Sequence, residues 1–157
     1  MSAELKNSGF NKKELTSEIE IDATPERIWS ILIEFDRFPE WNPFIREISG
    51  NVEKGKRLSV TLHPSGGRTL KMSPTLLEVE PCKELRWIGH LGISRIFDGE
   101  HIFELKPMGP GKTTFVQRER FAGILLPFLI GMLRGETARG FNEMNLALKR
   151  RAEGTSS

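Results

Sequence analysis

The sequence predicts one α+β domain in which an antiparallel β-sheet packs against a long C-terminal α-helix. Between residues 58 and 121 one strand-like segment follows another with no helical segment between them, an order typical of antiparallel sheets. From Pro127 to about Ala152 apolar residues recur at helical spacing along one stripe. Since such a helix must bury its stripe, the concave face of the sheet is its expected partner.

One strand and a short helical region are expected before these segments. Residues 15–22, "LTSEIEID", alternate as a half-buried strand does. Thr24 fits the N-cap of a helix and Pro25 its first turn. Pro39 is expected to stop that helix. The sequence therefore predicts two short helices directly after the first strand.

The stretch "FDRFPEWNPFI", residues 35–45, is too apolar for a solvated loop and too rich in proline for a regular element. Asn42, which precedes Pro43, is expected to be extended and to hydrogen-bond nearby backbone groups. Trp41 and Phe44 then either cap the core or line the entrance of an internal pocket. Both interpretations stay open at this point.

The strand segments carry two more local predictions. The apolar phase slips by one residue at Leu76 and Leu77, which indicates a β-bulge. The turn-rich "PMGPGK" joins residues 97–106 to residues 113–121, which predicts a hairpin. We expect the domain to span residues 15–153, with residues 1–14 and 154–157 as flexible termini.

Composition excludes several classes of function. The chain has 157 residues and a net charge of +2 with interleaved signs, which gives little support to nucleic-acid binding. Cys82 is the single cysteine and the three histidines are scattered, so we expect neither metal nor other cofactor. The polar N-terminus lacks the apolar core of a signal peptide, so a cytoplasmic protein is expected.

The apolar segment "FAGILLPFLIGML", residues 121–133, is the one candidate for membrane contact. It is shorter than the roughly twenty residues that a spanning helix needs, and a proline and two glycines interrupt it. We therefore expect a strand end that leads into a buried helix, and no stable membrane insertion.

Several stretches together resemble START-like, or SRPBCC, domains. They are "IDATPERIWSILIEFDRFPEWNPFI", "PCKELRWIGHLG", "GEHIFEL", "TTFVQRERFAGIL" and "GFNEMNLALKRRAE". More narrowly, they are similar to the polyketide cyclase/dehydrase and lipid-transport group. The resemblance implies the helix-grip fold, a curved antiparallel sheet wrapped around a long C-terminal helix with an apolar cavity between them. It does not fix a function, because this fold serves carriers, receptors and enzymes.

Strand parity identifies the inward face of the predicted hairpin without the resemblance. The charged even positions of residues 97–106 should face water, which turns His101 and Phe103 inward. The same argument turns Gln117 and Glu119 inward on the partner strand. His101 then lies opposite Glu119, or opposite Gln117 after a shift of one pair. These polar groups form either a hydrogen-bonded pair in a filled core or the polar end of a cavity.

The candidate ligand-binding residues are those expected to face the cavity or its rim. They are Phe35, Trp41, Phe44, Met72, Trp87, His101, Phe103, Gln117, Glu119, Phe141 and Met144. His101 and Glu119 are also candidates for acid–base catalysis.

Three functions remain open from the sequence. The first is a binding protein for a hydrophobic small molecule or lipid. The second is a cyclase, dehydratase or aromatase that uses His101 and Glu119, although the chain has no tyrosine and few inward hydroxyl donors. The third is an interaction protein of the Hsp90-activator type. The sequence does not specify the oligomeric state.

Overall fold

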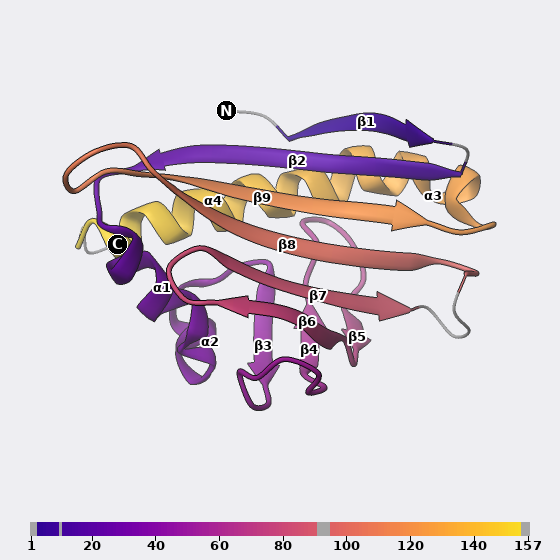
Figure 1. The fold of residues 1–157 in the computed structure, drawn as a ribbon. Coiled ribbons are helices and arrows are strands. Elements are labelled where there is room, and N and C mark those ends of the chain that lie inside the picture. The colour runs from indigo at the N-terminus through magenta and orange to yellow at the C-terminus, as the bar shows by residue number, and fades with distance from the viewer. Residues whose placement is uncertain (1–2, 10, 91–94, 155–157) are drawn as a thin grey trace.

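Two antiparallel sheets and one long helix make up the fold in the computed structural model, which describes residues 3–9, 11–90 and 95–154. The six-stranded sheet has the order β1-β2-β9-β8-β7-β6, and a three-stranded sheet has the order β3-β4-β5 (Figure 1). The six strands are β1 (Glu4–Gly9), β2 (Lys12–Ile21), β6 (Thr75–Glu80), β7 (Glu84–His90), β8 (Asp98–Pro107) and β9 (Thr113–Ala122). The smaller sheet contains β3 (Ile45–Ser49), β4 (Ser59–Leu62) and β5 (Leu70–Met72).

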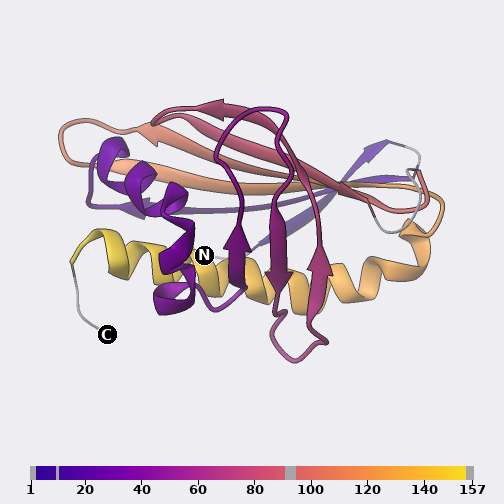
Figure 2. The same cartoon turned by 90° about the horizontal axis from the view of Figure 1, so that it is seen from below.

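The long helix lies along the concave face of the six-stranded sheet, as both views show (Figures 1 and 2). It is continuous through α3 (Leu126–Met132), the π-helical turn η2 (Leu133–Thr137) and α4 (Ala138–Ala152). The α3 end lies beside the beginning of β8, where Leu125 N donates to the Ile96 carbonyl at 3.1 Å. This arrangement confirms the predicted helix-grip fold.

The short helices cover the opposite end of α4. They are α1 (Pro25–Ile33), the 3₁₀ turn η1 (Phe35–Arg37) and α2 (Phe38–Trp41). The Thr24 side chain accepts a hydrogen bond from Arg27 N, which confirms the N-cap. Pro39 lies in the first turn of α2 and does not stop a helix, so that prediction is wrong. A first-turn proline is tolerated because its missing N–H would have no partner there.

Asn42 fixes the turn from α2 into β3. Its backbone is extended, with φ −91° and ψ 109°, and its Oδ1 accepts from Phe44 N at 3.0 Å and from Ile45 N at 2.8 Å. These bonds confirm the predicted role of Asn42. They also hold Phe44 against α4, where its ring packs edge-to-face on Phe141 with centroids 5.6 Å apart.

The predicted register of the sheet agrees with the structure at the positions that matter for the site. The pairing of β6 with β7 shifts between Leu76 and Glu78, which confirms the bulge. In the β8–β9 hairpin Leu105 pairs with Phe115 and His101 with Glu119. The inward residues of both strands are buried as expected.

Two regions differ from the sequence prediction. Residues 1–14 were expected to be a flexible terminus, but β1 pairs with β2 from Glu4 to Gly9 and β2 begins at Lys12. The helix after β9 was expected to be buried, but Phe128 on α3 is 84% exposed and Ile124, just before it, is 66% exposed. Of the expected flexible tail, residues 155–157 lie outside the described residues.

Gly140 permits the close approach of α4 to the turn before β3. A Cβ atom at this position would lie 2.3 Å from Cδ2 of the Phe44 ring, well inside van der Waals contact. Gly131 on α3 offers a matched control, because a Cβ atom there would meet nothing within 4 Å.

We predict opposite effects of the same substitution at these two glycines. Gly140→Ala should lower the free energy of unfolding by roughly 1–3 kcal/mol through overpacking against Phe44. Gly131→Ala should raise it by about 0.5–1 kcal/mol, since alanine loses less backbone entropy in a helix. Urea unfolding followed by circular dichroism measures both. Equal stability of the two variants would contradict the tight packing at Gly140.

Candidate functional site

His101 lies at the centre of the concave face, enclosed by aromatic rings. Its ring centroid lies 4.5 Å from that of Phe103, 5.2 Å from that of Phe141 and 5.2 Å from that of Trp87. The residue is 2% exposed. Burial lowers the pKa of His101 to about 4, even though the bond to Gln117 favours the charged form. The imidazole is therefore neutral at pH 7.

A chain of hydrogen bonds, buried except at its last bond, connects His101 to the long helix. His101 Nε2 lies 2.9 Å from Gln117 Oε1, and Gln117 Nε2 donates to Asn145 Oδ1 at 2.9 Å. Asn145 Nδ2 in turn donates to Ser17 Oγ at 3.0 Å. Ser17 Oγ donates to Asn142 Oδ1 at 2.8 Å. The chain thus joins β8, β9 and β2 to α4 through the core.

The direction of this chain fixes the tautomer of His101. Gln117 Nε2 also faces the Phe141 carbonyl oxygen at 3.4 Å, and a carbonyl oxygen can only accept. Gln117 Oε1 therefore points to the imidazole, so His101 Nε2 must donate. In the neutral ring Nδ1 then carries no proton and is an acceptor.

Glu119 faces this acceptor across a short gap. Its Oε2 lies 3.7 Å from His101 Nδ1, too far for a hydrogen bond, and its side chain is 12% exposed. Its Oε1 lies over the backbone of Gly99, where a Cβ atom would come within 2.7 Å. Burial raises the pKa of Glu119 to about 8. The carboxyl is therefore protonated at pH 7 and can donate.

The pair leaves hydrogen-bonding capacity unused. No hydrogen bond to His101 Nδ1 or to the Glu119 carboxyl is seen among the described residues, although neither group is one of the fully enclosed side-chain atoms that lack a partner. One neutral proton donor and one acceptor thus face the same gap, an arrangement that suits a hydroxyl or carbonyl group of a bound molecule.

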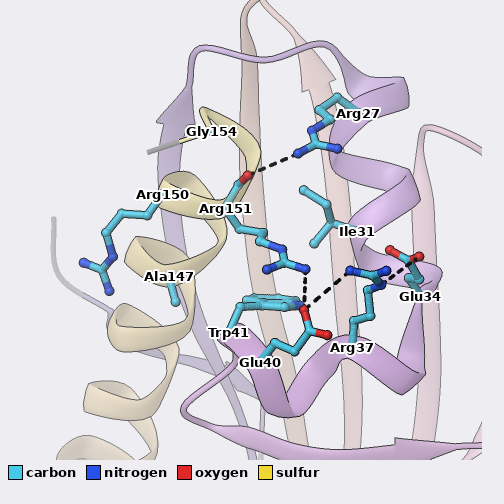
Figure 3. Close-up of a pocket in the computed structure, with 10 residues that line it drawn as sticks. All are labelled: Arg27, Ile31, Glu34, Arg37, Glu40, Trp41, Ala147, Arg150, Arg151 and Gly154. Carbon is cyan, nitrogen blue, oxygen red and sulfur yellow. Dashed lines mark hydrogen bonds and ion pairs between the residues drawn. The ribbon is translucent and has the colours of Figure 1, made fainter. Parts of the chain in front are cut away.

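The other candidate residues separate into three groups. Phe44, Met144 and Phe35 are buried in the core, where Phe35 packs edge-to-face on Phe38. Met72 is half-buried, and its Cε lies over Gly89 on β7. These buried side chains occupy part of the region in which the apolar cavity was expected. Trp41 lies elsewhere, in an external groove between α1, α2 and the end of α4 (Figure 3).

Three members of the polar chain, Ser17, Asn142 and Asn145, were not among the candidate residues from the sequence. Ser17 shares the inward face of β2 with Leu15 and Ile21, so the alternation of that strand already indicated its orientation. Asn145 follows Phe141 by four positions, which places it on the buried stripe of the helix. Ser17 and Asn145 were given no role because each is a polar residue on a face identified by its apolar members.

Two further features concern the described part of the chain alone. No three His, Cys, Asp or Glu side chains in residues 3–9, 11–90 and 95–154 gather as a set of metal ligands. Over the same residues, no helix combines the length and the apolar character needed to cross a membrane.

The protonation of Glu119 predicts how stability depends on pH. Its pKa is about 8 in the folded protein against an ordinary 4.5, so the folded state holds the extra proton between these values. The pKa of His101 is about 4 in the folded protein against an ordinary 6.5, so below pH 6.5 this residue makes the free energy of unfolding rise with pH. From pH 6.5 to 8 Glu119 therefore dominates, and stability should fall as pH rises.

We expect the free energy of unfolding to decrease over that range by on the order of 1 kcal/mol per pH unit. Glu119→Gln should flatten the profile, whereas Glu18→Gln, at an exposed position of β2, should leave the slope unchanged. Denaturant titrations at half-unit pH steps measure the slopes. An unchanged slope in Glu119→Gln would show that this carboxyl ionises normally in the folded state.

Known structures share this fold at low sequence identity. A START superfamily protein from Mycobacterium smegmatis matches with 20% identity and a TM-score of 0.72, over 91% of this chain and 99% of that chain. The Zhui aromatase/cyclase from Streptomyces sp. R1128 matches with 11% identity and a TM-score of 0.74, over 90% and 94%. Norcoclaurine synthase from Thalictrum flavum matches with 16% identity and a TM-score of 0.70, over 93% and 97%.

The family comparison covers almost the whole described chain. No curated protein sequence matches this chain. The model of the family described as polyketide cyclase/dehydrase and lipid transport, however, matches residues 12–153. This range runs from the first residue of β2 to just past the end of α4. The chain therefore belongs to the polyketide cyclase/dehydrase and lipid-transport family.

Proposed function

We propose that the protein binds an apolar small molecule or lipid that carries a hydroxyl or carbonyl group, between the six-stranded sheet and the long helix. The observation that carries this proposal is the pair of His101 Nδ1 and Glu119, which face each other at 3.7 Å with no hydrogen bond between them. A ligand hydroxyl in the gap would donate to Nδ1 and accept from the protonated carboxyl. A ligand carbonyl would accept from the carboxyl alone.

The neutrality of the pair supports an uncharged ligand. His101 carries no charge above about pH 4 and Glu119 none below about pH 8. A charged ligand group would have to be buried beside them without a counter-ion, at a cost of several kcal/mol. The surrounding rings of Phe103, Phe141 and Trp87 suit an apolar body.

Such a ligand would enter at the α3 end of the long helix. Glu119 lies three residues before the end of β9, and α3 follows after a short turn. Ile124 and Phe128 expose apolar surface there, and the neighbouring η2 interrupts the regular α-helical hydrogen bonding. Displacement of this end of the helix would open a path to the gap while the α4 contacts stay in place. Met72, with its flexible side chain over β7, can adjust to the ligand.

A second candidate function is enzymatic, and the geometry of the same pair favours it. The bond to Gln117 leaves Nδ1 as the basic nitrogen, and the protonated Glu119 beside it is an acid. With a β-keto substrate, Nδ1 would remove a proton from the carbon next to the carbonyl, and Glu119 would protonate the carbonyl oxygen to give the enol. Cyclase or aromatase chemistry begins with such a step.

The binding function predicts a co-purifying molecule. Protein isolated gently from its native cells should carry a neutral apolar compound at near one-to-one ratio, seen by native mass spectrometry and identified after solvent extraction. Glu119→Leu should reduce the occupancy about tenfold, because the variant lacks the protonated carboxyl that donates a hydrogen bond to the ligand. This variant replaces the carboxyl by an apolar side chain and leaves no unpaired polar group at position 119.

Glu18→Gln serves as the matched control and should retain full occupancy. Full occupancy in Glu119→Leu would refute the proposed binding position. The absence of any bound compound from protein prepared in several mild buffers would count against the function itself.

The enzymatic function predicts a defined pH window. Turnover of a poly-β-keto substrate should need His101 unprotonated and Glu119 protonated, so kcat/KM should be constant between about pH 4 and 8 and fall outside that range. His101→Ala should lower kcat by about 10²–10⁴-fold with the fold intact by circular dichroism. Activity that survives this substitution would exclude the catalytic role.

A further inference from the structure

The external groove beside Trp41 is chemically unlike the interior between the six-stranded sheet and the long helix. It has a volume of about 570 Å³, within the usual range of small-molecule sites. Its lining comes from α1, η1, α2 and the C-terminal part of α4 (Figure 3). The residues are Arg27, Ile31, Glu34, Arg37, Glu40, Trp41, Ala147, Arg150, Arg151 and Gly154.

Arginine outnumbers glutamate in this groove by four to two. Arg37 pairs with Glu34 at 3.3 Å and with Glu40 at 3.7 Å. Arg151 pairs with Glu40 at 2.7 Å. Both carboxylates are therefore already engaged, which leaves a net positive charge on the lining.

Arg27 is the cation whose binding capacity is least used. Among the described residues its guanidinium makes one hydrogen bond, from Nη2 to the Arg151 carbonyl oxygen at 3.4 Å, and meets no carboxylate. A guanidinium has five N–H donors, so most of them remain available. In Figure 3 the guanidinium groups of Arg37 and Arg151 converge on Glu40, Arg27 lies on the other side of Ile31 with its guanidinium directed at the Arg151 carbonyl oxygen, and Arg150 is directed away from the groove.

The lining of the groove also has an apolar part, which a ligand would have to match. Ile31 and Ala147 are buried side chains of its wall, and the half-buried Trp41 ring lies below Arg151. Trp41 Nε1 is buried and has no acceptor among the described residues. Its burial keeps this atom out of reach of a ligand in the groove, so the site combines cations with a flat aromatic surface.

We propose that this groove binds a small organic anion, a planar apolar body that carries a phosphate or carboxylate group. The anionic group lies between Arg27 and Arg151, where guanidinium donors bind oxygens in pairs. The planar body packs on Trp41. The site is separate from the gap at His101 and Glu119, so it does not depend on the function proposed above.

The test compares two probes that share one apolar body. Binding of 1-naphthyl phosphate and of 1-naphthol is measured by calorimetry and by the indole N–H signals of the three tryptophans in nuclear magnetic resonance spectra. Trp41→Phe assigns the Trp41 signal. The phosphate should bind more tightly than the naphthol, weaken as salt rises, and shift the Trp41 signal while the Trp87 signal stays in place.

Two variants with opposite expected effects sharpen the test. Arg27→Gln should weaken binding of the phosphate about tenfold, because one charged hydrogen-bonding group is lost. Glu40→Gln should strengthen it, because Arg37 and Arg151 lose the carboxylate that competes with the ligand. Arg68→Gln, at an exposed position outside the groove, is the control and should bind as the unchanged protein does.

Several results would overturn the proposal. Equal affinity for 1-naphthol would show that the apolar body alone is recognised. Equal affinity in Arg27→Gln and Arg68→Gln would show that the groove is not the site. A shift confined to the Trp87 signal would place the probe between the six-stranded sheet and the long helix.

Discussion

The hydrogen bond from Gln117 Nε2 to Asn145 Oδ1 connects the middle of the sheet to the long helix. It lies in a fully buried region, where a missing partner on either side would leave an amide unsatisfied. The bond therefore sets both the height of α4 above β9 and its rotation. Phe141 reaches the His101 ring, and Phe44 reaches Gly140, only in this position of the helix. The same bond orients Gln117 toward His101, so the tautomer at the site follows from the packing of the fold.

Much of the fold could be predicted because its determinants are local. Strand parity turned His101, Gln117 and Glu119 inward, and the phase slip at Leu76 located the bulge. The gap at the site could not be predicted in this way. Strand pairing places His101 opposite Glu119. Whether His101 Nδ1 lies 3.7 Å from Glu119 Oε2 or within hydrogen-bond distance of it depends on the two rotamers and on the rings packed around them.

The missed elements have a different cause. β1 has almost no buried side chains, so its strand structure comes from backbone pairing with β2 and leaves no apolar alternation in the sequence. The α3 segment has the composition of a buried helix, but it extends beyond the end of β9, where the described sheet offers no surface to cover Phe128. Trp41 belongs to the aromatic stretch 35–45, yet the turn at Asn42 separates it from Phe44, and the two rings lie in different environments. Composition identified these side chains as unusual without indicating which side of α4 each would occupy.

The position of β1 also bears on how the protein behaves in a crowded solution. Without it, the ten residues of β2 would form the edge of the sheet, and a long unpaired strand is a template for pairing with other chains. β1 is shorter, and its outer residues include Glu4, Lys6 and Asn7, all of which are polar. Charged side chains on an edge strand oppose the addition of a further strand. A segment that contributes little to the core thus protects the sheet from aggregation, and a truncation chosen from the family boundary at residue 12 would remove that protection.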